Sequence, residues 1–191
     1  MLERILFLVA RVRRGLELRT AYTGYQGMIE NQKLTEHYTL YDLTRTDHAD
    51  LLEANRHVTT DQVIKLIQVA ELFETAWQLL NVPILISSGY RCPALNAAVG
   101  SSMRSQHLLC EAGDGVPKGM PVDEAFRILR ARSKEGKIRF GQMIWEKQNR
   151  GYANGAVEWI HLSLGFPYRT SERCGQILTM VDGHYDLVET V

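Results

Sequence analysis

Residues 105–114 read Ser105-Gln106-His107-Leu108-Leu109-Cys110-Glu111-Ala112-Gly113-Asp114, and residues 158–161 read Glu158-Trp159-Ile160-His161. Together they offer two imidazoles and one carboxylate, in His107, Asp114 and His161. This ligand set can hold a catalytic Zn²⁺ and leave a fourth position for water, which a nearby glutamate can deprotonate. The two segments therefore indicate a zinc hydrolase site.

Four ordered segments resemble motifs of the zinc D-Ala-D-Ala carboxypeptidases (peptidase family M15), which include vancomycin-resistance dipeptidases and phage L-alanyl-D-glutamate endolysins. The family pattern Ser-x-His-x-x-Gly-x-Ala-x-Asp is similar to residues 105–114, and Glu-x-x-His to residues 158–161. Residues 86–96, Ile-Ser-Ser-Gly-Tyr-Arg-Cys-Pro-Ala-Leu-Asn, resemble the family's Ser-Gly-Tyr-Arg segment. Residues 140–146, Phe-Gly-Gln-Met-Ile-Trp-Glu, resemble a strand before the second histidine. The resemblance runs from about Lys33 to about Met180.

The resemblance implies a hedgehog/DD-peptidase-like α+β fold and a role for each site residue. His107, Asp114 and His161 would bind Zn²⁺, and Glu158 would serve as base and then as acid to the leaving amine. In a regular strand, however, side chains three residues apart point to opposite faces, so Glu158 would need a bulge or twist to reach the site. Glu146, at the end of the preceding expected strand, is the alternative base.

Two further residues of these motifs are candidates for substrate contacts. Arg91 would stabilise a developing oxyanion or bind the substrate's carboxylate, because a fixed guanidinium suits both tasks. A structural salt bridge is the alternative for Arg91. Ser105 would hydrogen-bond to the substrate or orient the loop that carries His107.

The chain departs from the family pattern at Cys110, which stands where the family has glycine. If that position requires a positive φ, cysteine would be strained there. Cys110 is also a rival zinc ligand, since thiolates suit this metal. The run Gly113-Asp114-Gly115 is richer in glycine than the usual Ala-Asp-hydrophobic ending, and its composition is also typical of a turn.

Composition limits the partners. The 191 residues suit one domain with its own core, and Lys+Arg and Asp+Glu both number 22. This balance gives no reason to expect a nucleic-acid or electrostatic membrane partner. The odd number of cysteines, at Cys92, Cys110 and Cys174, favours free thiols, with a Cys92–Cys110 disulfide as the alternative.

Residues 1–27 differ from the rest of the chain, with five arginines against two glutamates. Their apolar run, residues 5–10, is too short for a secretory signal or a membrane span. We interpret residues 1–27 as an N-terminal extension, either a disordered arm or sequence before a natural start at Met28, with a short amphipathic helix as the third alternative. Residues 28–191 would then form the catalytic domain.

Apolar periodicity and turn residues predict an α+β fold in which helices pack on a mostly antiparallel sheet. The predicted helices span residues 60–80 and 121–133, with a short helix at 93–99 and a helical turn at 39–43. The predicted strands span residues 84–87, 138–145, 156–164, 176–181 and 185–188. Hairpin turns are expected at Asn154-Gly155 and Asp182-Gly183.

The sequence thus predicts a monomeric Zn²⁺ metallopeptidase that cuts D-amino-acid-containing stem peptides of peptidoglycan, as a carboxypeptidase or as an endopeptidase. The resemblance to phage endolysins implies that the protein is a phage or prophage lysis enzyme, which stays in the cytoplasm until it is released to act on the cell wall. The alternative is an inactive zinc-containing module that binds peptidoglycan or serves in a phage particle. Fold alone does not decide between these functions.

Overall fold

A computed structural model describes residues 32–149, 155–165 and 174–191. The helices are α2 (Leu40–Thr44), η2 (Ala49–Leu51), α3 (Leu52–Arg56), α4 (Thr60–Leu80), α5 (Pro93–Ala98) and α6 (Val122–Lys134). The strands are β1 (Ile84–Ser88), β2 (Ala112–Pro117), β3 (Gln142–Gln148), β4 (Val157–Ser163), β5 (Gln176–Val181) and β6 (His184–Thr190). The predicted 1–27 extension, residue Met28 and Asn154 lie outside the described residues.

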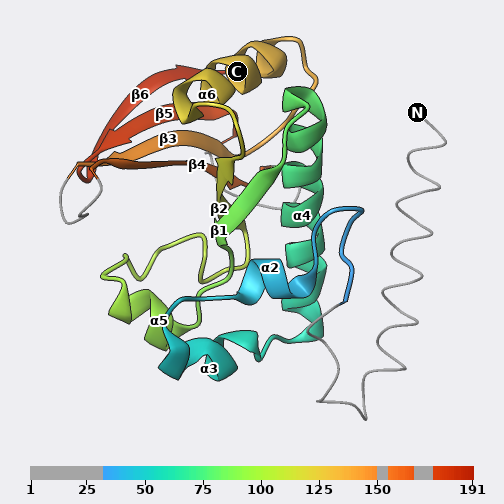
Figure 1. Cartoon of the computed structure of the whole chain (residues 1–191), viewed down its shortest axis with the longest axis vertical. Coiled ribbons are helices and arrows are strands. Elements are labelled where there is room, and N and C mark those ends of the chain that lie inside the picture. Colours follow the sequence, from blue (N-terminus) through green and yellow to red (C-terminus); the bar gives the residue numbers. More distant parts are fainter. Residues whose placement is uncertain (1–31, 150–154, 166–173) are drawn as a thin grey trace.

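The six strands form one sheet in the order β1-β2-β4-β3-β5-β6. All neighbouring strands are antiparallel except β3 and β5, which are parallel. Helix α4 lies against β1 and β4, and α6 lies against β2, β3 and β4, so both helices cover one face of the sheet (Figure 1). The predicted α+β fold with a mostly antiparallel sheet is confirmed.

Helix α4 is the main core helix, and both of its ends follow from the sequence. Thr59 and Gln62 form a capping box at its start, and Asn81, with φ of 54°, ends it in the left-handed region. Its apolar face is buried, with side chains that include Val63, Leu66, Val69, Ala70 and Phe73. The predicted span of residues 60–80 is confirmed.

Other predicted elements are confirmed with shifted ends. The expected strand at 138–145 begins only at Gln142, because Ile138 and Phe140 are buried in the core before the sheet pairing starts. The Asp182-Gly183 hairpin has φ of 51° and 88° at its two turn residues, as a type I′ turn requires. Helices α3 and η2 and strand β2 were not predicted.

Strand β2 passes through Gly113-Asp114-Gly115, so the turn interpretation of this run is wrong. A Cβ atom on Gly113 would lie 2.8 Å from the Phe73 ring, and one on Gly115 would lie 2.7 Å from the same ring. The two glycines therefore let α4 approach the sheet closely, as glycines within strands often do. Because side chains alternate along a strand, Asp114 points to the opposite face.

None of the described helices combines the length and the apolar character that a membrane span needs. Cys92 and Cys110 are free thiols, so the structure does not contain the alternative Cys92–Cys110 disulfide.

Candidate metal centre

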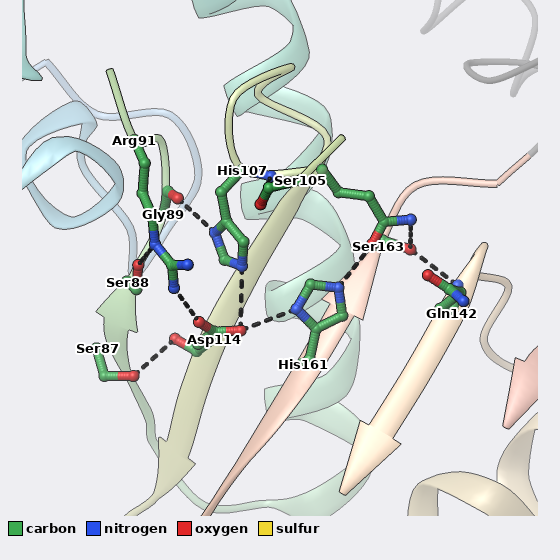
Figure 2. A network of polar contacts seen from close by, with 11 residues as sticks. Ser87, Ser88, Gly89, Arg91, Ser105, His107, Asp114, Gln142, His161 and Ser163 are labelled. Carbon is green, nitrogen blue, oxygen red and sulfur yellow. Dashed lines mark hydrogen bonds and ion pairs between the residues drawn. The ribbon is translucent and has the colours of Figure 1, made fainter. Parts of the chain in front are cut away.

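His107, Asp114 and His161 come together on the sheet face that α4 and α6 leave uncovered (Figure 2). One ligand atom from each residue lies within 4.8 Å of the others, and all three side chains are buried. Asp114 on β2 is directly opposite His161 on β4, so the strand pairing itself sets this contact. His107 comes from the loop that precedes β2.

The outer nitrogen of each imidazole ring faces a hydrogen-bond acceptor. His107 donates from Nδ1 to the carbonyl oxygen of Gly89 at 2.6 Å, and His161 donates from Nε2 to Oε1 of Gln106 at 2.8 Å. Gln106 is held in turn, because its Nε2 donates to the Ser163 hydroxyl at 3.1 Å. Such partners fix the tautomer and orientation of a ligating histidine.

The inner nitrogens both face the carboxylate of Asp114. His161 Nδ1 lies 2.9 Å and His107 Nε2 lies 3.3 Å from Asp114 Oδ1. When the outer nitrogens carry the ring protons, the inner nitrogens and the Asp114 Oδ1 atom all direct lone pairs toward one another. Such a group is stable only with a positive charge at its centre, carried by a metal ion or by extra protons on the rings. The donor set and its geometry therefore fit a metal ion.

Arg91 belongs to the same cluster through its contact with Asp114. Its Nη2 lies 2.7 Å from Asp114 Oδ2, and its Nε donates to the Ser88 hydroxyl at 2.8 Å. Asp114 thus directs one carboxylate oxygen to the two imidazoles and the other to the guanidinium. Burial by itself would raise the pKa of Asp114, but the neighbouring His107 and His161 lower it far below its usual range. Asp114 is therefore an anion in the cluster.

The segment that carries Gly89 and Arg91 is fixed by contacts that sequence reasoning missed. Asn55 is fully buried, donates to the carbonyls of Thr44 and Tyr90, and accepts from the Cys92 N–H. A Cβ atom on Gly89 would lie 2.3 Å from the carbonyl oxygen of Leu43, so only glycine fits there.

Ser105 and Cys110 lie in the loop on either side of His107. The Ser105 hydroxyl accepts a hydrogen bond from the His107 N–H at 3.3 Å, a contact that orients the loop. Cys110 is buried with φ of 57°, so the position does have the positive φ that glycine prefers. Burial raises the pKa of the Cys110 thiol to about 12, and this residue is not a member of the His107, Asp114 and His161 cluster.

The two candidate glutamates lie on opposite faces of the sheet. Glu158 is directly opposite Lys147 and its carboxylate contacts Lys147 Nζ and Trp145 Nε1, both at 3.0 Å. Trp145 packs against Phe126 of α6, so this is the helix-covered face. The regular strand therefore directs Glu158 away from His161, and the structure does not bring it to the metal ligands.

Glu146 lies on the same face as His161. On β3, Ile144 is directly opposite His161, and Glu146 follows two residues later, opposite Trp159. Only 8% of Glu146 is exposed. Burial raises the pKa of its carboxyl to about 7, the negative charge of Asp114 adds to the increase, and His161 and Arg91 oppose it. A carboxyl that titrates near neutrality beside a candidate metal site is suited to general acid–base work.

A family model described as peptidase M15 matches residues 41–147, which make up more than half of the chain. The chain belongs to the peptidase M15 family. The matched segment includes Arg91, His107, Asp114 and Glu146, and it ends before His161. A search of curated proteins gave no match. This match confirms the family membership that the sequence motifs predicted.

Proposed function

We propose that this peptidase M15 family member is a Zn²⁺-dependent peptidase that hydrolyses D-amino-acid-containing stem peptides of bacterial peptidoglycan. The observation that carries the proposal is the convergence of His107, Asp114 and His161, with the outer nitrogen of each ring held by an acceptor. The family match supports the reaction class, and the sequence motifs support the substrate class. We also propose that the fold is of the hedgehog/DD-peptidase type, with residues 28–191 as the catalytic domain.

In this proposal, His107 Nε2, Asp114 Oδ1 and His161 Nδ1 hold the metal. Zn²⁺ bound there supplies Lewis-acid chemistry, which polarises a peptide carbonyl and makes water more acidic. Arg91 keeps the carboxylate of Asp114 in place through Oδ2 at 2.7 Å. We propose that its guanidinium also contacts a substrate carboxylate or developing oxyanion, the role expected from the motif.

Glu146 takes the role of general base that the motif comparison gave to Glu158. It accepts a proton from the attacking water as the water oxygen bonds to the peptide carbonyl carbon. It then delivers that proton to the amine as the C–N bond breaks. Burial, which raises the pKa of this carboxyl to about 7 in the metal-free protein, favours the uptake of the proton by Glu146.

The second candidate function is an inactive metal-containing module that binds peptidoglycan or serves in a phage particle. The observation that favours it is the strained backbone of Cys110, in the same loop as His107. The glycine-rich run no longer supports it, because Gly113 and Gly115 are explained by the packing of Phe73. Both functions are compatible with bound metal, so turnover must distinguish them.

The test is mass analysis of purified peptidoglycan after incubation with the Zn²⁺-loaded protein, with the Glu146→Gln variant as the control. Loss of a terminal D-Ala would identify a carboxypeptidase, and a cleaved bond within the stem peptide or cross-bridge would identify an endopeptidase. No product from any muropeptide would favour the inactive module. By analogy with phage members of the family, we further propose that the protein is a lysis enzyme of a phage or prophage. It would reach the cell wall after its release and act there as a monomer.

A further inference from the structure

Two large side chains of the edge strand β6 are exposed on the face that carries the metal centre. Tyr185 is 58% exposed and Leu187 is 61% exposed. On the opposite face of β6, Glu189 pairs with Arg130 and with Lys134 of α6. The exposure of Tyr185 and Leu187 is thus confined to one side of the strand.

Strand register connects both residues to the site. One cross-strand row runs from Glu146 on β3 through Met180 on β5 to Tyr185 on β6. The next row runs from Asp114 and His161 through Ile144 and Leu178 to Leu187. Residues that are directly opposite in neighbouring strands share a face, so both rows lie on the side of the metal ligands.

The separation along these rows suits contact with a bound peptide. Neighbouring strands are about 4.8 Å apart, so β6 lies roughly 10 Å from β3. A fully extended chain spans at most about 3.3–3.6 Å per residue, so a peptide bound at Glu146 would reach β6 in about three residues. Ile144 and Met180 lie in these two rows and are buried apolar side chains of the same face.

The electrostatics of Tyr185 are consistent with this placement. Partial desolvation raises the pKa of its phenol, and the negative charges of Glu146 and Asp114 raise it further, against the positive charge of Arg91. The hydroxyl thus experiences the charges of the site although the side chain as a whole is exposed. It remains protonated at neutral pH and can donate a hydrogen bond.

We propose that Tyr185 and Leu187 form a substrate-binding subsite on the same sheet face as Glu146 and the metal centre, which holds the stem peptide on the β6 side of the cleaved bond. The Tyr185 hydroxyl donates to a carbonyl or carboxylate oxygen of the peptide, and Leu187 packs against its aliphatic groups. This inference rests on the proposed peptidase function. Both cross-strand rows continue to Glu146 and His161, and this continuity favours a bound peptide over a second copy of the chain on this surface.

The test compares Tyr185→Phe and Leu187→Ala with Asp186→Ala, a control between them on the opposite face, in steady-state cleavage of a purified muropeptide by Zn²⁺-loaded full-length protein. Loss of one neutral hydrogen bond corresponds to a change of about 2- to 10-fold. We expect each subsite variant to raise KM by about that factor with kcat changed less than twofold. Asp186→Ala should match wild type.

Wild-type turnover with an unchanged KM in both subsite variants would overturn this inference and leave the proposed function standing. Absence of wild-type turnover would overturn both. Light scattering of the same proteins tests whether a second copy of the chain occupies this face instead. A wild-type dimer that becomes a monomer in Leu187→Ala would assign the face to that second copy.

Discussion

Glu146 and His161 lie on the same face of neighbouring strands, whereas Glu158 lies on the opposite face, three residues before His161. The pairing of Ile144 with His161 and of Lys147 with Glu158 fixes both positions. We therefore expect Glu146→Gln to retain Zn²⁺ and fold but to lose about 10²- to 10⁴-fold in kcat, the usual contribution of a general base. Glu158→Gln is the matched control and should lose little activity. If Glu158→Gln loses much more activity than Glu146→Gln, the general base is Glu158.

Gln106 should contribute to metal affinity, because it accepts the hydrogen bond that directs the His161 Nδ1 lone pair to the site. Removing such a partner typically weakens metal binding by about 10- to 100-fold. We expect Gln106→Ala to show a loss of this size in competition with a chelator. Ser163→Ala removes the hydroxyl that accepts from Gln106 Nε2 and from the Gln142 N–H, and it should show a smaller loss of metal affinity. Equal affinity in wild type and Gln106→Ala would refute the tautomer assignment.

Cys110 should limit stability through its backbone. Glycine at this position relieves the positive φ, and alanine does not, although both substitutions remove the buried thiol. The left-handed conformation costs a non-glycine residue roughly 1–2 kcal/mol. Cys110→Gly should therefore be more stable than Cys110→Ala by about 1 kcal/mol in denaturant unfolding, and both should keep full metal content. Loss of metal in both variants would instead make Cys110 a ligand.

Stability of the metal-free protein should depend on pH through Glu146. Its folded pKa of about 7 exceeds the unfolded value of 4.5, so the unfolded chain releases this proton first as pH rises. The native state is then destabilised progressively between about pH 4.5 and 7, by a penalty on the order of 3 kcal/mol at most above that range. In chelator-treated protein, Glu146→Gln should raise the thermal midpoint more at pH 8 than at pH 4. An equal shift at the two pH values would contradict this account.

Sequence reasoning succeeded where local patterns decide the structure and failed where the decision depends on tertiary contacts. The ends of α4 follow from Thr59, Gln62 and the apolar repeat, which act within the helix itself. Strand β2 was missed because glycines at 113 and 115 resemble a turn until Phe73 packs on them.

The proposed metal ligands and the proposed base illustrate the same division. His107, Asp114 and His161 were named from their motifs, but Gln106 and Asn55 act through partners 55 and 37 residues away, which no local pattern reveals. Alternation along a strand already indicated that Glu158 would face away from His161. Choosing Glu146 required the register between β3 and β4.

The central claim is that His107, Asp114 and His161 bind one Zn²⁺. It is tested most directly by anomalous diffraction at the zinc edge from crystals of the Zn²⁺-loaded protein. We expect one strong peak in contact with His107 Nε2, Asp114 Oδ1 and His161 Nδ1, at about 2.0–2.2 Å from each atom. A peak at another group, such as the cluster of Glu36, His37 and Glu74, with none between the two imidazoles, would contradict the account.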